Sequence, residues 1–171
     1  ALNCSLCEGG KYSSIMGGKN CLDCPSGKYS NISGTILCKE CSPNTEQNTD
    51  KTKCECSSGF YYDIKNDICV ECDAVSFICP KGTLIETMIL KTDYWRASNN
   101  TIETYKCKNK YACKGGKISN STDSLCYDGH SGPICDVCKK GWAKSDGKCY
   151  KCLTSTSVKA RSYFLTALIP I

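Results

Sequence analysis

The chain has 171 residues, 18 of them cysteine, while leucine, isoleucine, valine and phenylalanine together make up less than about a fifth of the sequence. Such a low aliphatic content excludes a conventional globular core, so disulfide closure must replace apolar burial. The net charge of +5 comes from lysines scattered singly or in pairs, which argues against a nucleic-acid-binding protein. The sequence therefore predicts a small disulfide-rich fold, mostly β and irregular: an elongated string of cysteine-rich hairpin modules with one cysteine-poor β-hairpin insertion.

Persistent disulfides require an oxidising compartment, so the protein is expected to be extracellular or on the cell surface. Four Asn-x-Ser/Thr sequons agree with passage through a secretory route, and they predict N-glycosylation at Asn31, Asn99, Asn120 and Asn3. The sequons at Asn31 and Asn99 are the most persuasive, because each falls in a segment expected to be exposed. No cofactor is expected apart from these N-linked glycans.

Residues 1–41 contain a repeat with a strict period of 17. The period is set by two series of cysteines, namely Cys4, Cys21, Cys38 and Cys7, Cys24, Cys41. Each unit reads Cys-x-x-Gly-x-Tyr, a polar loop and then Cys-x-x-Cys, with Gly10 and Gly27 at the turn position. A period this short indicates a small supersecondary unit that cannot bury a core alone. If the long gap in each unit closes as a hairpin, Cys7 pairs with Cys21 and Cys24 pairs with Cys38.

Residues 42–72 vary this pattern. Cys54-Glu-Cys56-Ser-Ser-Gly59-Phe60 has the Cys-x-Cys-x-x-Gly-aromatic order, which resembles the C-terminal signature of an EGF-like domain. The preceding Cys-x-x-Cys-Pro-x-Gly-x-Tyr unit is similar to the cysteine-rich repeats of ephrin-receptor-like and tumour-necrosis-factor-receptor-like proteins. The resemblance covers residues 4–72 and implies two disulfides, Cys41 with Cys54 and Cys56 with Cys69.

Residues 73–106 form the cysteine-poor insertion, since no cysteine lies between Cys79 and Cys107. The segment contains the strongest β pattern of the chain, in residues 83–90, 94–98 and 101–105. The last two runs flank Asn99-Asn100 and predict a hairpin whose tip carries the sequon. Trp95 is either the local core of this small sheet or part of a surface that docks a partner.

Residues 107–152 return to regular cysteine spacing. The segment from Cys126 to Trp142 reads Cys-x-x-Gly-His-x-Gly-x-x-Cys-x-x-Cys-x-x-Gly-Trp, which resembles the second half of a laminin-type EGF-like module. The resemblance implies disulfides between Cys126 and Cys135 and between Cys138 and Cys149. His130 stands where that family usually has tyrosine or phenylalanine.

Residues 153–171 end in an apolar run that is too short to cross a bilayer, which requires about 20 residues. Three interpretations stay open: the start of a membrane helix that continues beyond Ile171, a peptide that docks on another module or subunit, and a packed tail. The order of the modules followed by such a run resembles large cysteine-rich surface proteins of ciliates and other protists.

The cysteines, the histidine and the acidic residues do not form a convincing metal or catalytic site. Paired Cys-x-x-Cys motifs could hold zinc, but the sequons and EGF-like aromatics favour disulfides, and no helical pattern supports a thioredoxin-like site. His130, the only histidine, is expected to fill an aromatic position and not to act as a base. Asp63, Asn66 and Asp67 are acidic or amide candidates for calcium, although they lie at the wrong end of a module. No metal site is assigned.

These observations predict a non-enzymatic extracellular structural or adhesive glycoprotein that self-associates, with a filament or surface coat as the assembled form. The alternative is a receptor ectodomain that binds a soluble protein ligand. The partner-binding residues expected from the insertion and the tail are Trp95, Phe164, Leu165, Leu168 and Ile169. Six cysteines have no firmly assigned partner, namely Cys4, Cys72, Cys79, Cys107, Cys113 and Cys152. For Cys4, Cys72, Cys79 and Cys152, a bond to a neighbouring chain is one option.

Overall fold

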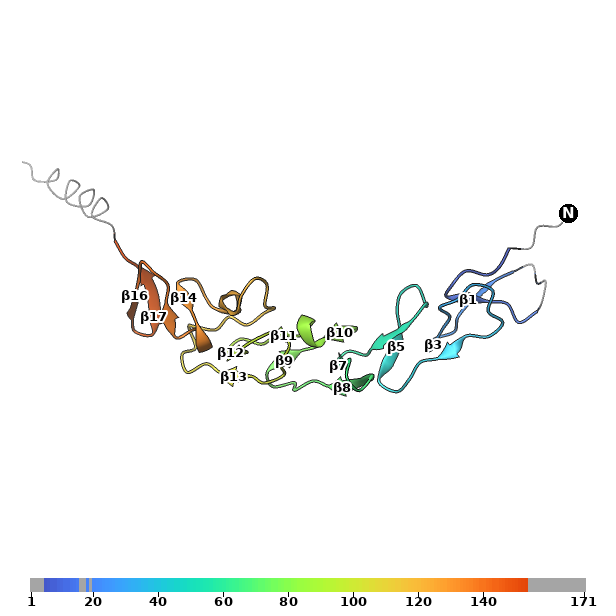
Figure 1. Ribbon diagram of the computed structural model, residues 1–171, viewed down its shortest axis with the longest axis horizontal. Coiled ribbons are helices and arrows are strands. Elements are labelled where there is room, and N and C mark those ends of the chain that lie inside the picture. Colours follow the sequence, from blue (N-terminus) through green and yellow to red (C-terminus); the bar gives the residue numbers. More distant parts are fainter. Residues whose placement is uncertain (1–4, 16–17, 19, 154–171) are drawn as a thin grey trace, which may run out of the picture. The chain divides into compact units, whose positions relative to one another are not determined.

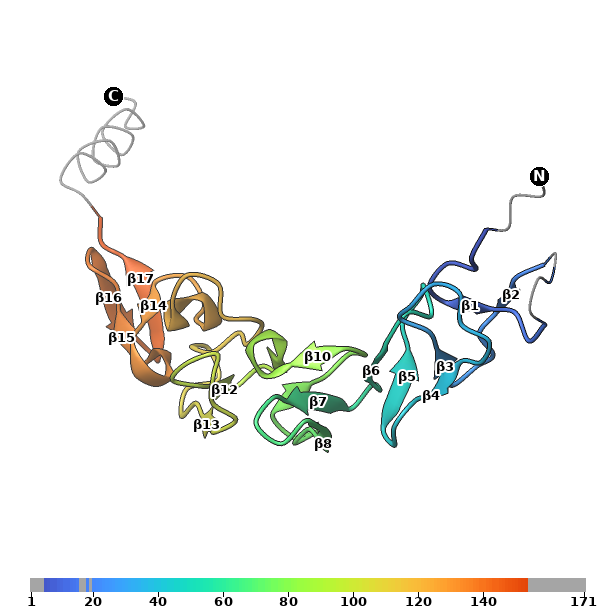
Figure 2. The same cartoon turned by 45° about the vertical axis from the view of Figure 1, so that its right-hand side comes forward.

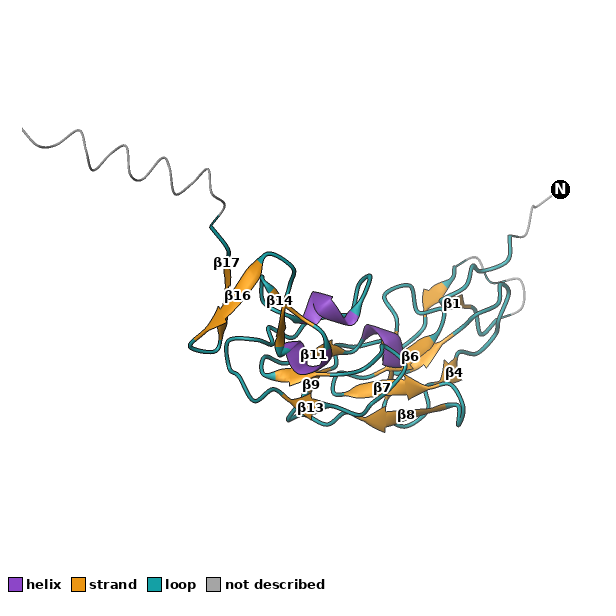
Figure 3. Cartoon of the chain, turned by 60° about the vertical axis from the view of Figure 1, so that its left-hand side comes forward, coloured by secondary structure: helices purple, strands orange, loops and turns teal. Residues whose placement is uncertain are grey.

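The computed structural model describes residues 5–15, 18 and 20–153, which fold into short β-strands and 3₁₀ turns joined by loops (Figures 1 and 3). The described chain contains no α-helix. It belongs to two compact units, residues 1–91 with 99–102 and residues 92–98 with 103–171. The fold is small, disulfide-rich and largely β or irregular, as the composition predicts.

The elements are β1 (Lys11–Tyr12), β2 (Leu22–Asp23), β3 (Lys28–Tyr29), β4 (Lys39–Glu40), β5 (Thr45–Gln47), β6 (Cys54–Cys56), β7 (Phe60–Asp63), β8 (Ile68–Glu71), β9 (Phe77–Ile78), β10 (Thr83–Leu84), η1 (Ile85–Thr87), β11 (Ile89–Leu90), β12 (Tyr94–Trp95), β13 (Tyr105–Lys106), η2 (Thr122–Leu125), β14 (His130–Ser131), η3 (Pro133–Cys135), β15 (Val137–Cys138), β16 (Trp142–Ser145) and β17 (Lys148–Lys151).

A single antiparallel hairpin recurs along the described chain. Its two strands pair over two to four residues, and one further backbone hydrogen bond closes its open end: the residue after the second strand donates its N–H to the carbonyl of the residue before the first strand. The distances are 2.8 or 2.9 Å in all eight copies. The closing pairs are Cys24 to Gly10, Cys41 to Gly27, Ser57 to Asn44, Cys72 to Gly59, Lys91 to Ser76, Cys107 to Asp93, Lys139 to Gly129 and Cys152 to Gly141.

The residue before the first strand usually adopts a left-handed backbone. Its φ is positive in seven of the eight hairpins, and five of those seven residues are glycine. Glycine adopts this region without a steric penalty, and asparagine and aspartate tolerate it better than other residues. Asn44 (φ 60°) and Asp93 (φ 71°) therefore take the place of the glycine that the sequence repeat shows at Gly10 and Gly27.

Disulfides staple six of these hairpins, and each bond joins a cysteine three residues ahead of the left-handed residue to a cysteine in the second strand or within two residues before it. In the second repeat, Cys24 and Cys38 each lie three residues before the two residues of the closing hydrogen bond. The side chains that they join are almost fully buried, although the strands between them are exposed or half-buried. The disulfide is therefore the local core of the hairpin, as expected where strands are too short to bury apolar surface.

The two remaining hairpins, β9–β11 and β12–β13, lie in the insertion and have no such staple. Their strands instead contribute the buried apolar side chains of Phe77, Leu90 and Trp95, and the residue before β11 contributes Met88. The insertion therefore does not interrupt the repeat: it continues the same backbone hairpin, with apolar packing in place of the cross-link. We had expected a single hairpin here, but the segment contains two.

The β-prone run 83–90 divides into three elements. β10 pairs in parallel with β7, which pairs on its other side with β8 (Figure 2), and β11 returns to β9. Between them the chain turns through η1, where Thr87 Oγ1 accepts the Leu84 N–H at 2.9 Å and donates to the Leu84 carbonyl at 3.1 Å. This side-chain-to-backbone exchange ends the strand that the sequence pattern indicated.

Adjacent hairpins within a unit are linked by the same left-handed residues. Gly10 and Gly59 donate their N–H groups to carbonyls 20 residues further along the chain, at Ser30 and Cys79, both at 2.8 Å. Asp93 makes the equivalent bond to Cys113 at 3.1 Å. One residue thus closes its own hairpin through its carbonyl and fixes the next through its N–H.

Asp73 ties the turn before β9 and gives it a dependence on pH. Its carboxylate accepts hydrogen bonds from the Val75 N–H (2.9 Å) and Ser76 Oγ (2.6 Å), and the bond from Ser76 is the main reason why its pKa lies below 3.8. A lowered pKa means that the ionised group stabilises the folded turn above pH 3.8, and that this stabilisation is lost as the pH falls through the lowered value. We expect the Ser76 amide resonance to titrate below about pH 4, and Asp73→Asn to abolish that titration.

Candidate functional site

The described structure contains eight disulfides. Six of them join the pairs expected from the sequence repeat and from the EGF-like resemblances. These are Cys7–Cys21, Cys24–Cys38, Cys41–Cys54, Cys56–Cys69, Cys126–Cys135 and Cys138–Cys149. All sixteen bonded thiols are thereby withdrawn from metal binding and from thiol chemistry.

The cysteines without an assigned partner separate into three groups. Cys72 bonds to Cys79 and Cys107 bonds to Cys113, so both pairs close short local loops. Cys152 has a free, exposed thiol. Cys4 lies outside the described residues, and so does the predicted sequon at Asn3.

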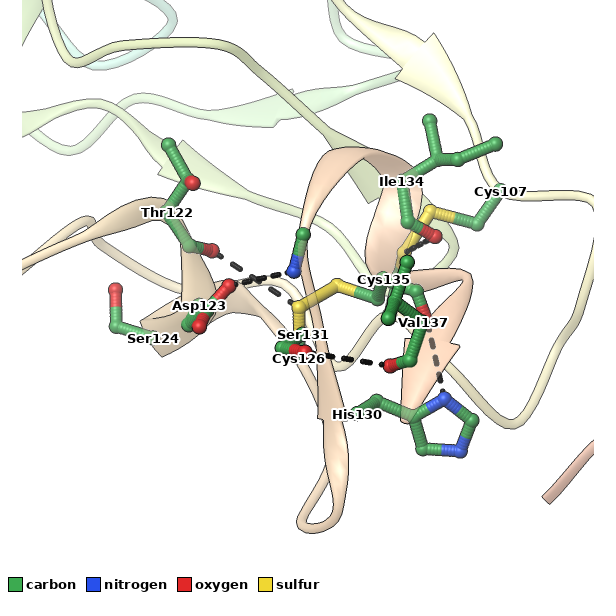
Figure 4. The surroundings of a disulfide bond; sticks show 12 residues. Cys107, Thr122, Asp123, Ser124, Cys126, His130, Ser131, Ile134, Cys135 and Val137 are labelled. Carbon is green, nitrogen blue, oxygen red and sulfur yellow. Dashed lines mark hydrogen bonds between the residues drawn. A yellow bond between two sulfur atoms is a disulfide. The ribbon is translucent and has the colours of Figure 1, made fainter. Parts of the chain in front are cut away.

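His130 is a buried titratable side chain, with 2% of its surface exposed. Its Nδ1 lies 3.0 Å from the Cys135 carbonyl, and its Nε2 lies 3.2 Å from the Cys149 amide nitrogen (Figure 4 shows the first contact). A carbonyl only accepts and a backbone amide only donates, so Nδ1 must carry the proton and Nε2 must be the acceptor. Both ring nitrogens are therefore occupied within the fold.

His130 consequently joins two stapled hairpins. His130 lies in β14, and its ring contacts the carbonyl of Cys135, which precedes β15, and the N–H of Cys149, which lies in β17. The position fills the aromatic slot that the sequence suggested, and it also satisfies two buried backbone groups, which an aromatic hydrocarbon ring cannot do. The geometry makes the imidazole a structural connector.

The other predicted residues are dispersed over the chain. Asn31 and Asn120 are exposed, and Asn99 is half-buried in a turn between β12 and β13. Trp95 is only 8% exposed and packs against Tyr105 with a centroid distance of 6.1 Å. That is the placement of a core residue, so the predicted docking role for its ring is not supported. The predicted tail residues Phe164, Leu165, Leu168 and Ile169 lie outside the described residues.

The calcium candidates form an ordinary hairpin turn. Asp63 accepts hydrogen bonds from the Lys65 N–H at 3.0 Å and from Asn66 Nδ2 at 2.7 Å, and Tyr62 donates to Asp67 at 2.6 Å. The bond from Asn66 is the largest cause of a lowered pKa at Asp63. These oxygens are engaged in the turn between β7 and β8, and the described residues contain no group of three metal-ligating side chains.

A shallow groove of about 350 Å³ lies on the second unit. Three partly exposed tyrosines line it, Tyr111, Tyr127 and Tyr150, together with the ammonium-bearing side chains of Lys110 and Lys148. Asp128 contributes one carboxylate, and the buried residues His130 and Cys149 also line the groove. Nothing in the linear sequence singled out this set, because its members come from three separate segments with no shared motif.

Three hydrogen bonds hold those segments together. Asn109 Nδ2 donates to the Gly147 carbonyl and so joins the loop of Tyr111 to the turn before β17. The Tyr127 N–H donates to the Ala112 carbonyl at 2.8 Å, and the Cys149 N–H donates to His130. Gly147 has a φ of 78°, and a β-carbon there would lie 3.3 Å from the Asn109 amide, so glycine permits the close approach. The groove is therefore built on a cross-linked frame.

The chain matches no protein-family model, no curated protein and no solved structure. Eight disulfides fit a secreted or extracellular protein. Among the described residues, no helix is long and apolar enough to span a membrane.

Proposed function

We propose that this protein is a non-enzymatic, extracellular structural or adhesive glycoprotein whose disulfide-stapled hairpins support self-association. The single observation that carries the proposal is the surface of the first two hairpins. There, six large aliphatic side chains are 55–74% exposed, although the aliphatic content of the chain is low. They are Leu6, Ile15, Leu22, Ile32, Ile36 and Leu37.

Two features support an interface between copies as the reason for this exposure. The backbone beneath these side chains is fixed, because Gly34 donates its N–H to the Cys7 carbonyl at 2.7 Å and Ser13 donates its N–H to the Thr35 carbonyl at 3.2 Å. A rigid surface loses little conformational entropy when it associates. Large exposed apolar surfaces mark interaction sites on soluble proteins, and these two hairpins carry six exposed aliphatic side chains.

The first test is the concentration dependence of the sedimentation coefficient. We expect the protein to self-associate, and the double variant Ile36→Ser/Leu37→Ser to raise the dissociation constant at least about tenfold, because burying each aliphatic side chain contributes about 1.5–3 kcal/mol. Ile64→Ser is the matched control, since Ile64 is 77% exposed but lies in the turn between β7 and β8.

All variants in this test should also carry Cys152→Ser, so that the exposed thiol cannot cross-link copies during the measurement. If the Ile36/Leu37 double variant and the Ile64 variant weakened self-association equally, the first two hairpins would not be the interface. A protein that stays monomeric at every concentration would contradict the self-associating role itself, and would favour the receptor-type alternative with a soluble ligand.

A further inference from the structure

Two ammonium groups in the groove of the second unit share one aromatic ring. Lys148 Nζ lies 4.2 Å from the centroid of Tyr111, and Lys110 Nζ lies 5.1 Å from it. The two nitrogens are therefore at most 9.3 Å apart, the sum of the two distances. This upper limit is comparable to the screening length at physiological ionic strength, which is about 8 Å, so one anion can interact with both charges.

No carboxylate of the described residues forms an ion pair with either ammonium group, although lysines elsewhere in the described chain do pair with carboxylates. Asp128 is the only acidic side chain that lines the groove, and it accepts the N–H of its own neighbour Gly129 at 3.0 Å. A ring face stabilises a cation only modestly at an exposed site, by about 0.5–1 kcal/mol. The arrangement therefore favours an external anion that bridges the two lysines.

The unit that holds the groove has a positive net charge, like the two lysines in the groove. Residues 92–98 and 103–153 carry eleven lysines and arginines against six acidic residues, a net charge of +5. Residues 1–91 and 99–102 carry nine against eleven, a net charge of −2. The lysines that appear scattered in the sequence are thus concentrated on the unit that holds the groove, which raises the local concentration of a polyanion.

The tyrosines narrow the chemical class of the anion. Tyr111, Tyr127 and Tyr150 are 41%, 43% and 53% exposed, so their rings are partly open to solvent although they line a concave surface. The C–H bonds on the face of a sugar ring pack well against the negative face of an aromatic ring, while the tyrosine hydroxyl can hydrogen-bond to sugar hydroxyls. An acidic peptide would pair with the lysines but would make no comparable use of several open rings.

We propose that this groove binds an anionic polysaccharide, with carboxylate or sulfate groups at Lys110 and Lys148 and sugar rings on Tyr127 and Tyr150. The site deepens the adhesive role proposed above by giving it a ligand class, yet it needs no self-association, because one copy contains all of it. The fixed segments around Asn109 and His130 present the groups in place before the ligand arrives, which reduces the entropic cost of binding.

The test measures binding of the full chain to dextran sulfate and to polygalacturonate, with uncharged dextran, polyglutamate and a single-stranded oligothymidylate as comparison probes. We expect at least one of the two anionic polysaccharides to bind more tightly than any comparison probe, and its binding to weaken as salt rises. Lys110→Gln/Lys148→Gln should raise the dissociation constant at least about tenfold. Lys117→Gln/Lys140→Gln removes the same charge from exposed positions outside the groove, and should change it less than about twofold.

The tyrosines are tested separately from the charges. Tyr127→Ala/Tyr150→Ala should weaken polysaccharide binding at least about tenfold while leaving the weak binding of polyglutamate unchanged. Peptide mapping of the eight disulfides verifies that each variant folds. Equal losses in the two lysine pairs would overturn the site in favour of general charge attraction, and tighter binding of polyglutamate or oligothymidylate would overturn the ligand class. Loss of polysaccharide binding with intact self-association would refute this site alone.

Discussion

Replacing Cys24 and Cys38 together by alanine is expected to open the β3–β4 hairpin and to raise the rate of tryptic cleavage after Lys28 and Lys39 by about 100-fold. The disulfide closes a loop with a sequence separation of 14, which stabilises the closed form by about 3 kcal/mol on the chain-entropy estimate. Because cleavage requires the opened hairpin, the rate follows the population of that form.

The other interactions of this hairpin are too weak to replace the staple. Its strands pair over two residues each, and Lys28 forms an exposed ion pair with Glu40 at 3.0 Å, a kind of contact worth about 0–1 kcal/mol. The closing hydrogen bond from Cys41 to Gly27 adds about 1 kcal/mol more. Changing both cysteines avoids an unpaired thiol, and Cys152→Ser is the control that removes a cysteine without opening a loop. Wild-type cleavage rates in the double variant would show that the hairpin holds without its disulfide.

The stapled hairpins could be predicted because the residues that define each one lie close together in the sequence. A glycine three residues after a cysteine marks the left-handed start of a strand at Gly10, Gly27 and Gly141, and the next Cys-x-x-Cys marks its end. The aromatic residue two positions after Gly10 or Gly27, or one after Gly141, then lies in the first strand. The repeat spacing therefore predicted the first strands and the pairs Cys7–Cys21 and Cys24–Cys38, and the resemblance to EGF-like modules implied four further pairs.

In the insertion, the β pattern predicted the hairpin of β12 and β13, but the sequence did not show that this hairpin repeats the stapled ones, because other residues take the place of the glycine and the cysteines. Asp93 replaces the left-handed glycine, and Leu90 occupies the place of the first cysteine, three residues ahead of it. The backbone hydrogen bond from Cys107 to Asp93 is nevertheless the one that closes the other copies. The backbone hairpin therefore recurs even where the cysteine and glycine pattern is absent, because either a disulfide or an apolar cluster can hold the two strands together.

The groove could not be predicted for a different reason. Tyr111, Tyr127 and Tyr150 are brought together by long-range hydrogen bonds, such as that between Asn109 and Gly147, whose partners are 38 residues apart. Each tyrosine alone looks like one of ten in a tyrosine-rich chain. Only the pairing of the hairpins tells which rings share a surface.

His130→Phe is expected to destabilise the second unit by about 2–6 kcal/mol, although phenylalanine fits the aromatic slot that the laminin-type resemblance assigns to this position. The imidazole accepts from the Cys149 N–H and donates to the Cys135 carbonyl, and both cysteines are buried. Leaving a buried backbone group without a partner costs about 1–3 kcal/mol, and phenylalanine would leave two. Guanidinium unfolding of the oxidised protein measures the loss.

Two further substitutions at His130 separate hydrogen bonding from shape. His130→Gln keeps an acceptor that can reach the Cys149 N–H, and His130→Asn keeps a donor near the Cys135 carbonyl, so each should lose less than phenylalanine does. Hydrogen exchange of the Cys149 amide should be faster in the phenylalanine and asparagine variants than in the glutamine variant. If position 130 required only an aromatic shape, phenylalanine would be the most stable of the three. A ranking with phenylalanine last would establish that this histidine is kept for its two nitrogens, because they connect β14 to β17 where a ring alone would only fill space.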